Sequence, residues 1–291
     1  MPLKKNIALA FLIIFVSSAT FEGCAFKSTT YLPSQAEQKL IKTLQDEFHY
    51  QPLVKSVGKT LWIYMPQRRD IFTIKAKDGM AKPPVRKLTI AYLDGDFRNK
   101  TFILEYDIVP TTKSPSDNGL ATAYTEDFNQ EYRNLLGVVA QVYLNTEMPP
   151  DFIVIIFADI RNGIEIINTL CFEDLKKYQS SALPYEEYSL RVLSESKGNP
   201  KIVNDETGSH IAYGDVPWPD FLLRQIVKRI FFKYQQSDFE PGEDTEHELL
   251  TIARETLRIY HFEDFTAVEL HDLHQNSRRT IGKDELENLI P

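Results

Sequence analysis

Residues 151–172, DFIVIIFADIRNGIEIINTLCF, indicate how this chain folds. Every position from Ile153 to Phe157 is apolar, whereas a strand with one face in water alternates apolar and polar residues. These five residues are therefore predicted to form a central strand covered on both faces. Asn162-Gly163, a pair that favours a tight hairpin turn, then leads the chain into a second strand over Ile164–Phe172.

The sequence around this stretch shows a recurring order, in which a helix is followed by a hairpin. Apolar spacing predicts a helix over Tyr124–Asn145, before the two strands. Residues 244–282 show the same order, and residues 34–76 follow it more loosely. The expected class is α+β, with an antiparallel or mixed sheet built from helix-then-hairpin units and helices packed on it.

A short sequence match accompanies the repeated order. Shifting the later copy by 113 residues places Asp151-Phe152 on Asp264-Phe265 and Asp159-Ile160 on Asp272-Leu273. Either a duplication or the common use of a helix followed by strands explains the match.

Local signals predict two further elements. Ser34 and Glu37 have the spacing of a capping box, so a first helix is expected to run from Ser34 to Phe48. Residues 88–93 and 102–109 are rich in β-forming residues, and Asp94-Gly95-Asp96 is the expected turn of this hairpin.

Composition predicts one acidic globular body over residues 34–291, with a candidate subdivision near residues 111–123. A hydrophobic content of 43% is ample for a core. Removing Lys4, Lys5 and Glu22 with a cleaved leader changes the net charge from -8 to -9. An acidic surface argues against nucleic acid as a partner.

The first residues have the three parts of a secretory signal. Lys4 and Lys5 are basic, Ile7–Val16 is an unbroken apolar run, and small residues follow at 17–19. The run is too short to span a bilayer, which needs roughly 20 apolar residues. We therefore expect export of the chain, with residues 1–23 as a signal peptide.

Two cleavage sites compete within this leader. Cleavage after Ala19 would release a free secreted protein. Alternatively, Phe21-Glu22-Gly23-Cys24 resembles the lipobox of bacterial envelope lipoproteins, although phenylalanine and glutamate replace the usual leucine and small residue. The resemblance implies that Cys24 is acylated and anchors the protein to a membrane through a tether over residues 24–33. Cys171, the other cysteine, is expected to be a buried free thiol.

Glu269, His271 and His274 form the best candidate metal site in the sequence. On a strand, however, Glu269 and His271 share one face while His274 lies on the other, which favours an ordinary strand end. Asp94, Asp96 and Glu105 have partial EF-hand spacing, but Arg98 stands where an oxygen ligand is needed. No metal or other cofactor is therefore expected.

Two further candidates concern catalysis and docking. Asp159 and Asp272 end their strands and are candidate acid/base groups, although such aspartates more often cap a turn. Trp218, at the start of a helix, is a candidate partner-docking residue, and anchoring of that helix in the core is the alternative.

These observations favour a non-enzymatic envelope lipoprotein, a binding or scaffolding module with an envelope protein as candidate partner. A secreted or anchored hydrolase whose site collects Asp159, Asp272 and His271 is one alternative. A periplasmic small-ligand binder is the other.

Overall fold

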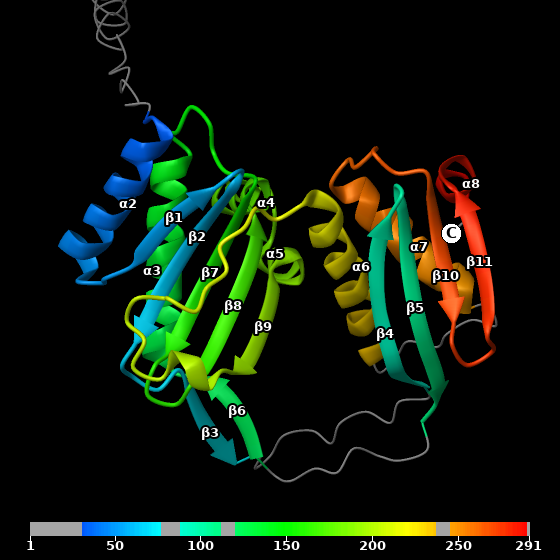
Figure 1. The fold of residues 1–291 in the computed structure, drawn as a ribbon, viewed down its shortest axis with the longest axis horizontal. Coiled ribbons are helices and arrows are strands. Elements are labelled where there is room, and N and C mark those ends of the chain that lie inside the picture. Colours follow the sequence, from blue (N-terminus) through cyan, green and yellow to red (C-terminus); the bar gives the residue numbers. More distant parts are fainter. Residues whose placement is uncertain (1–30, 77–87, 112–119, 237–244, 290–291) are drawn as a thin grey trace, which may run out of the picture.

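The chain forms two lobes, each built on its own β-sheet (Figure 1). The computed structural model describes residues 31–76, 88–111, 120–236 and 245–289. The first lobe has a five-stranded sheet of order β1-β2-β7-β8-β9, and the second has a four-stranded sheet of order β11-β10-β5-β4. A two-stranded arm, β3-β6, extends the first lobe. The described helices and strands have these bounds: α2 Pro33–Phe48, β1 Leu53–Val57, β2 Thr60–Gln67, β3 Phe72–Ala76, β4 Leu88–Arg98, β5 Thr101–Pro110, β6 Leu120–Tyr124, α3 Glu126–Tyr143, β7 Phe152–Asp159, β8 Ile164–Cys171, α4 Phe172–Gln179, α5 Tyr185–Arg191, β9 Leu193–Gly198, the 3₁₀ turn η1 Pro200–Ile202, α6 Trp218–Gln235, α7 Thr245–Ile259, β10 Ala267–Asp272, β11 Ser277–Gly282 and α8 Lys283–Glu287.

The apolar run at the centre of the sequence is the central strand of the first lobe. β7 lies between β2 and β8, and all eight of its residues are buried. Ile153, Ile155 and Phe157 face the core under helices α2 to α5, whereas Val154 and Ile156 face a smaller cluster that contains Ile202. The prediction of a strand covered on both faces is therefore confirmed, as is the hairpin of β7 with β8.

The expected α+β class is confirmed: the five-stranded and four-stranded sheets are mixed, and the two-stranded arm is antiparallel. Within the described ranges, helix-then-hairpin units occur three times, as α2-β1-β2, α3-β7-β8 and α7-β10-β11. The first two share the five-stranded sheet through parallel pairing of β2 with β7, while the third pairs in parallel with β5 in the other sheet.

Four neighbouring strands have the same order and the same directions in the two sheets, and β9 is an additional strand of the first sheet. Each contains an antiparallel hairpin joined in parallel to a second hairpin, β1-β2 to β7-β8 and β4-β5 to β10-β11. Asp159 and Asp272 occupy equivalent positions at the ends of their strands. In each case the amide of the following residue donates to a carbonyl on the parallel neighbouring strand, that of Gln67 in the first sheet and that of Tyr106 in the second.

At the starts of the strands, the structurally equivalent positions are shifted by two residues from those of the sequence match. Asp151 N donates to Lys59 O (2.8 Å) and Thr266 N donates to Lys100 O (2.7 Å), so Asp151 corresponds to Thr266 and not to Asp264. β10 has six residues and β7 has eight, which accounts for the difference.

Two local expectations were wrong. Helix α2 begins at Pro33, whose fixed φ suits the first helical position, and Leu32 is the N-cap in place of Ser34. β4 continues through residues 94–96, and the hairpin turns at Asn99-Lys100, where both residues have positive φ (50° and 60°). A two-residue turn with this twist matches the twist of the flanking strands.

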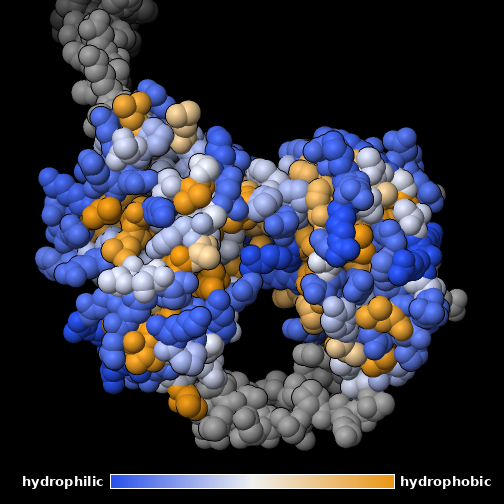
Figure 2. Space-filling view, in the orientation of Figure 1, coloured by the Kyte–Doolittle hydropathy of each residue, from blue (hydrophilic) through white to orange (hydrophobic). Residues whose placement is uncertain are grey.

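The lobes meet around helix α6, which packs on β4 and also contacts β9. Phe152, Cys171 and Phe221 form a small apolar cluster there. On the face in Figure 2, hydrophilic residues cover most of both lobes and apolar residues appear in separate patches. The chain passes between the lobes after β3, after β5 and before α6, so no single cut near residues 111–123 separates them.

Candidate functional site

The metal candidates are only partly brought together. His271 Nε2 lies 2.5 Å from Glu269 Oε1, and both side chains line a pocket on the face of the sheet away from the helices, together with Glu105. His274 follows the strand, is 65% exposed and lies 3.8 Å from Asp107 Oδ1. Within the described residues, no three His, Cys, Asp or Glu side chains are arranged to hold a metal ion.

Asp159 and Asp272 lie in different sheets, and each accepts hydrogen bonds within its own turn. Asp159 Oδ1 accepts from the amides of Arg161 (3.1 Å) and Asn162 (3.0 Å). Asp272 Oδ1 accepts from the amide of Gln275 (2.9 Å). The structure therefore does not assemble these aspartates into one site.

Trp218 lies where the two lobes join. Its ring packs on Phe152, with centroids 4.7 Å apart, and its Nε1 donates to Asp151 Oδ2 (3.3 Å). These contacts are those of a helix anchor. Cys171 belongs to the same cluster, and burial raises the pKa of its thiol to about 12, whereas Cys24 lies outside the described residues.

A partly buried ionic network that the sequence did not reveal joins the lobes nearby. Arg191 pairs with Asp174 Oδ1 and with Glu187 Oε1, each at 2.8 Å. Arg229, from α6, also reaches Glu187 Oε1 (3.0 Å). Each charge in this network has an opposite partner, so its role is to hold α4 and α5 against α6.

A second unpredicted cluster fixes the long segment between β9 and α6 to the first sheet. His210 Nδ1 lies 2.8 Å from Asp205 Oδ2, and its Nε2 contacts Glu165 on β8. Although burial opposes the effect, hydrogen bonds from His210 and Thr207 hold the pKa of the Asp205 carboxyl below its usual range. Tyr64 OH donates to the Asp205 carbonyl (2.6 Å).

A buried carboxyl lies in an open cleft where the parallel strands β2 and β7 end. Glu131, on α3, is 4% exposed, and its Oε1 accepts from Gln67 Nε2 (2.6 Å). Arg69 lies 3.4 Å from its other oxygen. Burial raises the pKa of Glu131. The cleft has a volume of about 700 Å³, and the groups around Glu131 are already paired.

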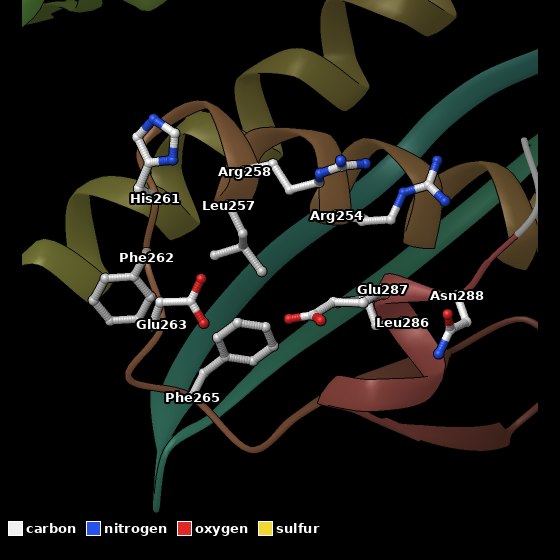
Figure 3. A pocket seen from close by; sticks show the side chains of 10 residues that line it. All are labelled: Arg254, Leu257, Arg258, His261, Phe262, Glu263, Phe265, Leu286, Glu287 and Asn288. Carbon is white, nitrogen blue, oxygen red and sulfur yellow. The ribbon is translucent and has the colours of Figure 1, made fainter.

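A cavity in the second lobe has cations that lack such partners (Figure 3). Its volume is about 590 Å³. Helix α7 contributes Arg254 and Arg258, which are one turn apart and therefore lie on one face of the helix. The apolar part of the wall consists of buried Leu257, Phe265 and Leu286, with Phe262 beside them.

Arg254 is 5% exposed and has no carboxylate partner among the described residues. One terminal nitrogen of its guanidinium donates to the Leu289 carbonyl, while Nε meets no acceptor in the described part of the chain. Arg258 is exposed, and no described side chain pairs with it. A buried cation is costly unless it is paired, so an anion bound here would complete the site.

Two carboxylates line the other side of this cavity. In Figure 3, Glu263 and Glu287 point toward the space between α7 and α8, beside the ring of Phe265. Lys283 contacts Glu263 and lies 4.0 Å from Glu287. Its hydrogen bond to Glu263 raises the pKa of Lys283.

The sequence analysis did not identify Glu131 or Arg254, although one feature of the sequence marks both residues. Glu131 lies between Phe128 and Leu135, on the apolar face of α3. Arg254 lies between Leu250 and Leu257, at i+4 and i−3, on the buried face of α7. A charged residue in an apolar helix stripe is unusual and marks a position to inspect.

Comparison of the chain with protein-family models, with curated proteins and with solved structures gives no match. Among the described residues, no helix combines the length and the apolar character needed to cross a bilayer.

Proposed function

We propose that this protein is an exported, lipid-anchored envelope protein that binds a carboxylate-bearing ligand in the cavity of its second lobe. The observation that carries the proposal is Arg254, a buried guanidinium in the cavity wall whose Nε has no described acceptor. Arg258 presents a second, exposed cation one turn along the same helix. Guanidinium groups bind carboxylates through charge-assisted hydrogen bonds.

A carboxylate suits the cavity better than a phosphate. Glu263 and Glu287 line the same cavity as the two arginines, and Lys283 offsets one of their charges. A ligand with two negative charges would meet more repulsion from these carboxylates than a ligand with one. The apolar wall of Leu257 and Phe265 favours an anion that also carries a hydrocarbon part.

Binding is better supported than hydrolysis. Asp159 and Asp272 cap separate turns, and His271 contacts Glu269 on the second sheet, so the three candidates for a hydrolase do not converge. None of the described residues that line the cavity is a serine, threonine or cysteine. The cavity volume of about 590 Å³ is within the range of small-ligand sites, and its charged groups can fix the orientation of a ligand.

The location rests on the leader sequence. Lys4, Lys5 and the apolar run Ile7–Val16 support export, and Gly23-Cys24 supports acylation at Cys24. If the bound carboxylate belonged to another envelope protein, its binding would agree with a scaffolding role.

Binding is tested by calorimetric titration of the full-length protein, purified in detergent, with pentanoate at pH 7. We expect saturable binding that weakens about tenfold in Arg258→Gln, because a hydrogen bond to a charged group contributes roughly 1.5 kcal/mol or more. Arg133→Gln, on the exposed face of α3, is the matched control and should bind as the unmodified protein does. Absence of pentanoate binding, or equal weakening in both variants, would contradict the proposal.

Anchoring is tested by intact-mass spectrometry of the membrane-extracted protein beside Cys24→Ala. We expect a mature chain that begins at Cys24 and carries acyl mass, and loss of this species in the variant. A chain that begins at Thr20 without lipid would contradict the anchor and leave the binding site to be judged separately.

A further inference from the structure

We infer that the ligand of the second-lobe cavity is a zwitterion, an α-amino acid with an apolar side chain, whose ammonium group binds Glu287. This inference rests on the proposed carboxylate site and adds a second, oppositely charged contact. Its basis is that the cavity has a cationic side and an acidic side, joined by apolar residues (Figure 3).

The cationic side is formed by one helix face. Arg254 and Arg258 lie four residues apart on α7, and Arg254 is held in place by its bond to the Leu289 carbonyl. Arg258 remains exposed at the last turn of the helix, where a cation is favourable because helix carbonyls point outward. A carboxylate that reaches between these two guanidinium groups would pair with both.

The acidic side has one carboxylate in excess. Glu263 is in direct contact with Lys283, whereas Glu287 approaches the same lysine only at the limit of an ion pair, 4.0 Å. One ammonium group therefore offsets one of two carboxylates. Glu287 is about half exposed, at 51% of its side chain, so an incoming cation can reach it.

The apolar wall suits a hydrocarbon side chain, and the volume is large enough for a whole amino acid. Leu257 and Phe265 are 3% and 7% exposed. In Figure 3, Leu257 projects from α7 toward the carboxylates, and the ring of Phe265 lies beside them. A cavity of about 590 Å³ is within the size range of sites for small ligands. A simple carboxylic acid would pair with the cationic side and leave the Glu287 carboxylate without a positively charged partner. A zwitterion would neutralise both sides.

The test compares two probes that differ only in the amino group. Pentanoate and L-norvaline, which is 2-aminopentanoate, are titrated separately into the full-length protein at pH 7. We expect norvaline to bind about tenfold more tightly than pentanoate, from one additional charge-assisted contact. In Glu287→Gln this preference should disappear while pentanoate binds at least as well as before.

The control is Glu285→Gln, an exposed position on the same short helix that does not line the cavity. It should keep the full preference for norvaline, because it changes the charge of α8 by the same amount without touching the site. A preference that weakens equally in Glu285→Gln would show a general charge effect and overturn the assignment of Glu287.

The remaining outcomes separate this inference from the proposed function. If pentanoate binds and norvaline binds no more tightly, the zwitterion is excluded and the carboxylate site stands. If norvaline is preferred equally in Glu287→Gln, the ammonium group does not meet Glu287 and the inference fails. If neither probe binds, the proposed function fails with it.

Discussion

Tyr260 donates a hydrogen bond from its hydroxyl to Asp174 Oδ2 at 2.9 Å and thereby joins the end of α7 to α4. The bond crosses between the lobes, because α4 packs on the five-stranded sheet and α7 on the four-stranded one. Asp174 is 3% exposed and also accepts from Arg191, so its carboxylate is satisfied from both lobes. Burial, together with Asp174, raises the pKa of Tyr260.

Removing this hydroxyl should loosen the connection between the lobes. Tyr260→Phe keeps the ring contacts with Trp218 and Phe221 but leaves one oxygen of a buried carboxylate without its donor. We expect a loss of about 1.5–3 kcal/mol in the free energy of unfolding. Urea denaturation measures it, with Tyr185→Phe as control, since Tyr185 is 64% exposed. Equal stability of the two variants would mean that the bond does not hold the lobes together.

Because Lys228 is partly buried, we expect the free energy of unfolding to rise with pH in the mildly alkaline range. Burial lowers its pKa to about 8, below the value near 10.4 of an unfolded chain, while its Nζ donates to the Val192 carbonyl (2.5 Å). Between these two values the unfolded chain binds more protons than the folded one, so stability increases with pH. Chemical denaturation from pH 7.5 to 9.5 should show this increase.

The variant Lys228→Met isolates the contribution of this lysine. It lacks the titrating group and should show a flatter stability profile than the unmodified protein in the same interval. The interval ends below the range in which unfolded tyrosines ionise, near pH 10. Parallel profiles for the two proteins would assign the change in stability to other groups.

Glu131 predicts the opposite dependence at acidic pH. Burial raises its pKa above that of an unfolded glutamate, near 4.3, so the folded chain binds more protons just above that value. Stability contributed by this group is therefore highest at low pH and is lost as pH rises through the folded pKa. Glu131→Gln, which still offers an oxygen to Gln67, should remove this loss and be at least as stable at pH 7. Thermal unfolding across pH 4–7 measures it.

The matched control for that measurement is Glu126→Gln on the same helix, at a side chain that is 80% exposed. It should retain the pH dependence of the unmodified protein. A profile for Glu131→Gln that follows this control would show that Glu131 ionises as an ordinary surface carboxyl does.

Two glycines predict opposite effects of alanine. Gly58 has φ +59°, and an added Cβ would lie 2.5 Å from Asp215 Oδ2, which belongs to a carboxylate that accepts from Lys59 N and Thr60 Oγ1. Gly58→Ala should therefore cost about 1–3 kcal/mol. Gly137 lies inside helix α3 with open space around it, so Gly137→Ala should stabilise by roughly 0.5–1 kcal/mol. Chemical denaturation of both variants measures the change in the free energy of unfolding. A change of the same sign in the two variants would refute this account.

The predictions that depended on local pattern agree with the structure where the pattern was unambiguous. A run of five apolar residues can satisfy burial only between two covering layers, and Asn162-Gly163 supplies the positive φ that the turn uses. The turn of the earlier hairpin was misplaced because Asp94-Gly95-Asp96 resembles a turn as strongly as Asn99-Lys100 does. Only the pairing of β4 with β5 distinguishes the two positions.

The candidate site was not predicted, for a related reason. The pattern of helix α7 indicates that Arg254 lies on a buried face, but it does not indicate what else lines that region. Glu263 and Glu287 come from a loop and from a helix at the end of the chain, and the β10-β11 hairpin separates them in the sequence.

The central strand that the apolar run 153–157 encodes is thus determined by the sequence itself, since the period of apolar residues directly sets which faces are buried. The tertiary structure alone decided that β2 pairs in parallel with β7 and β5 with β10, which gives two lobes whose sheets share an arrangement of four strands. It also decided that Arg258 and Glu287 share one cavity. Periodicity specifies the faces of each element, whereas the choice of neighbour depends on contacts between residues far apart in the chain.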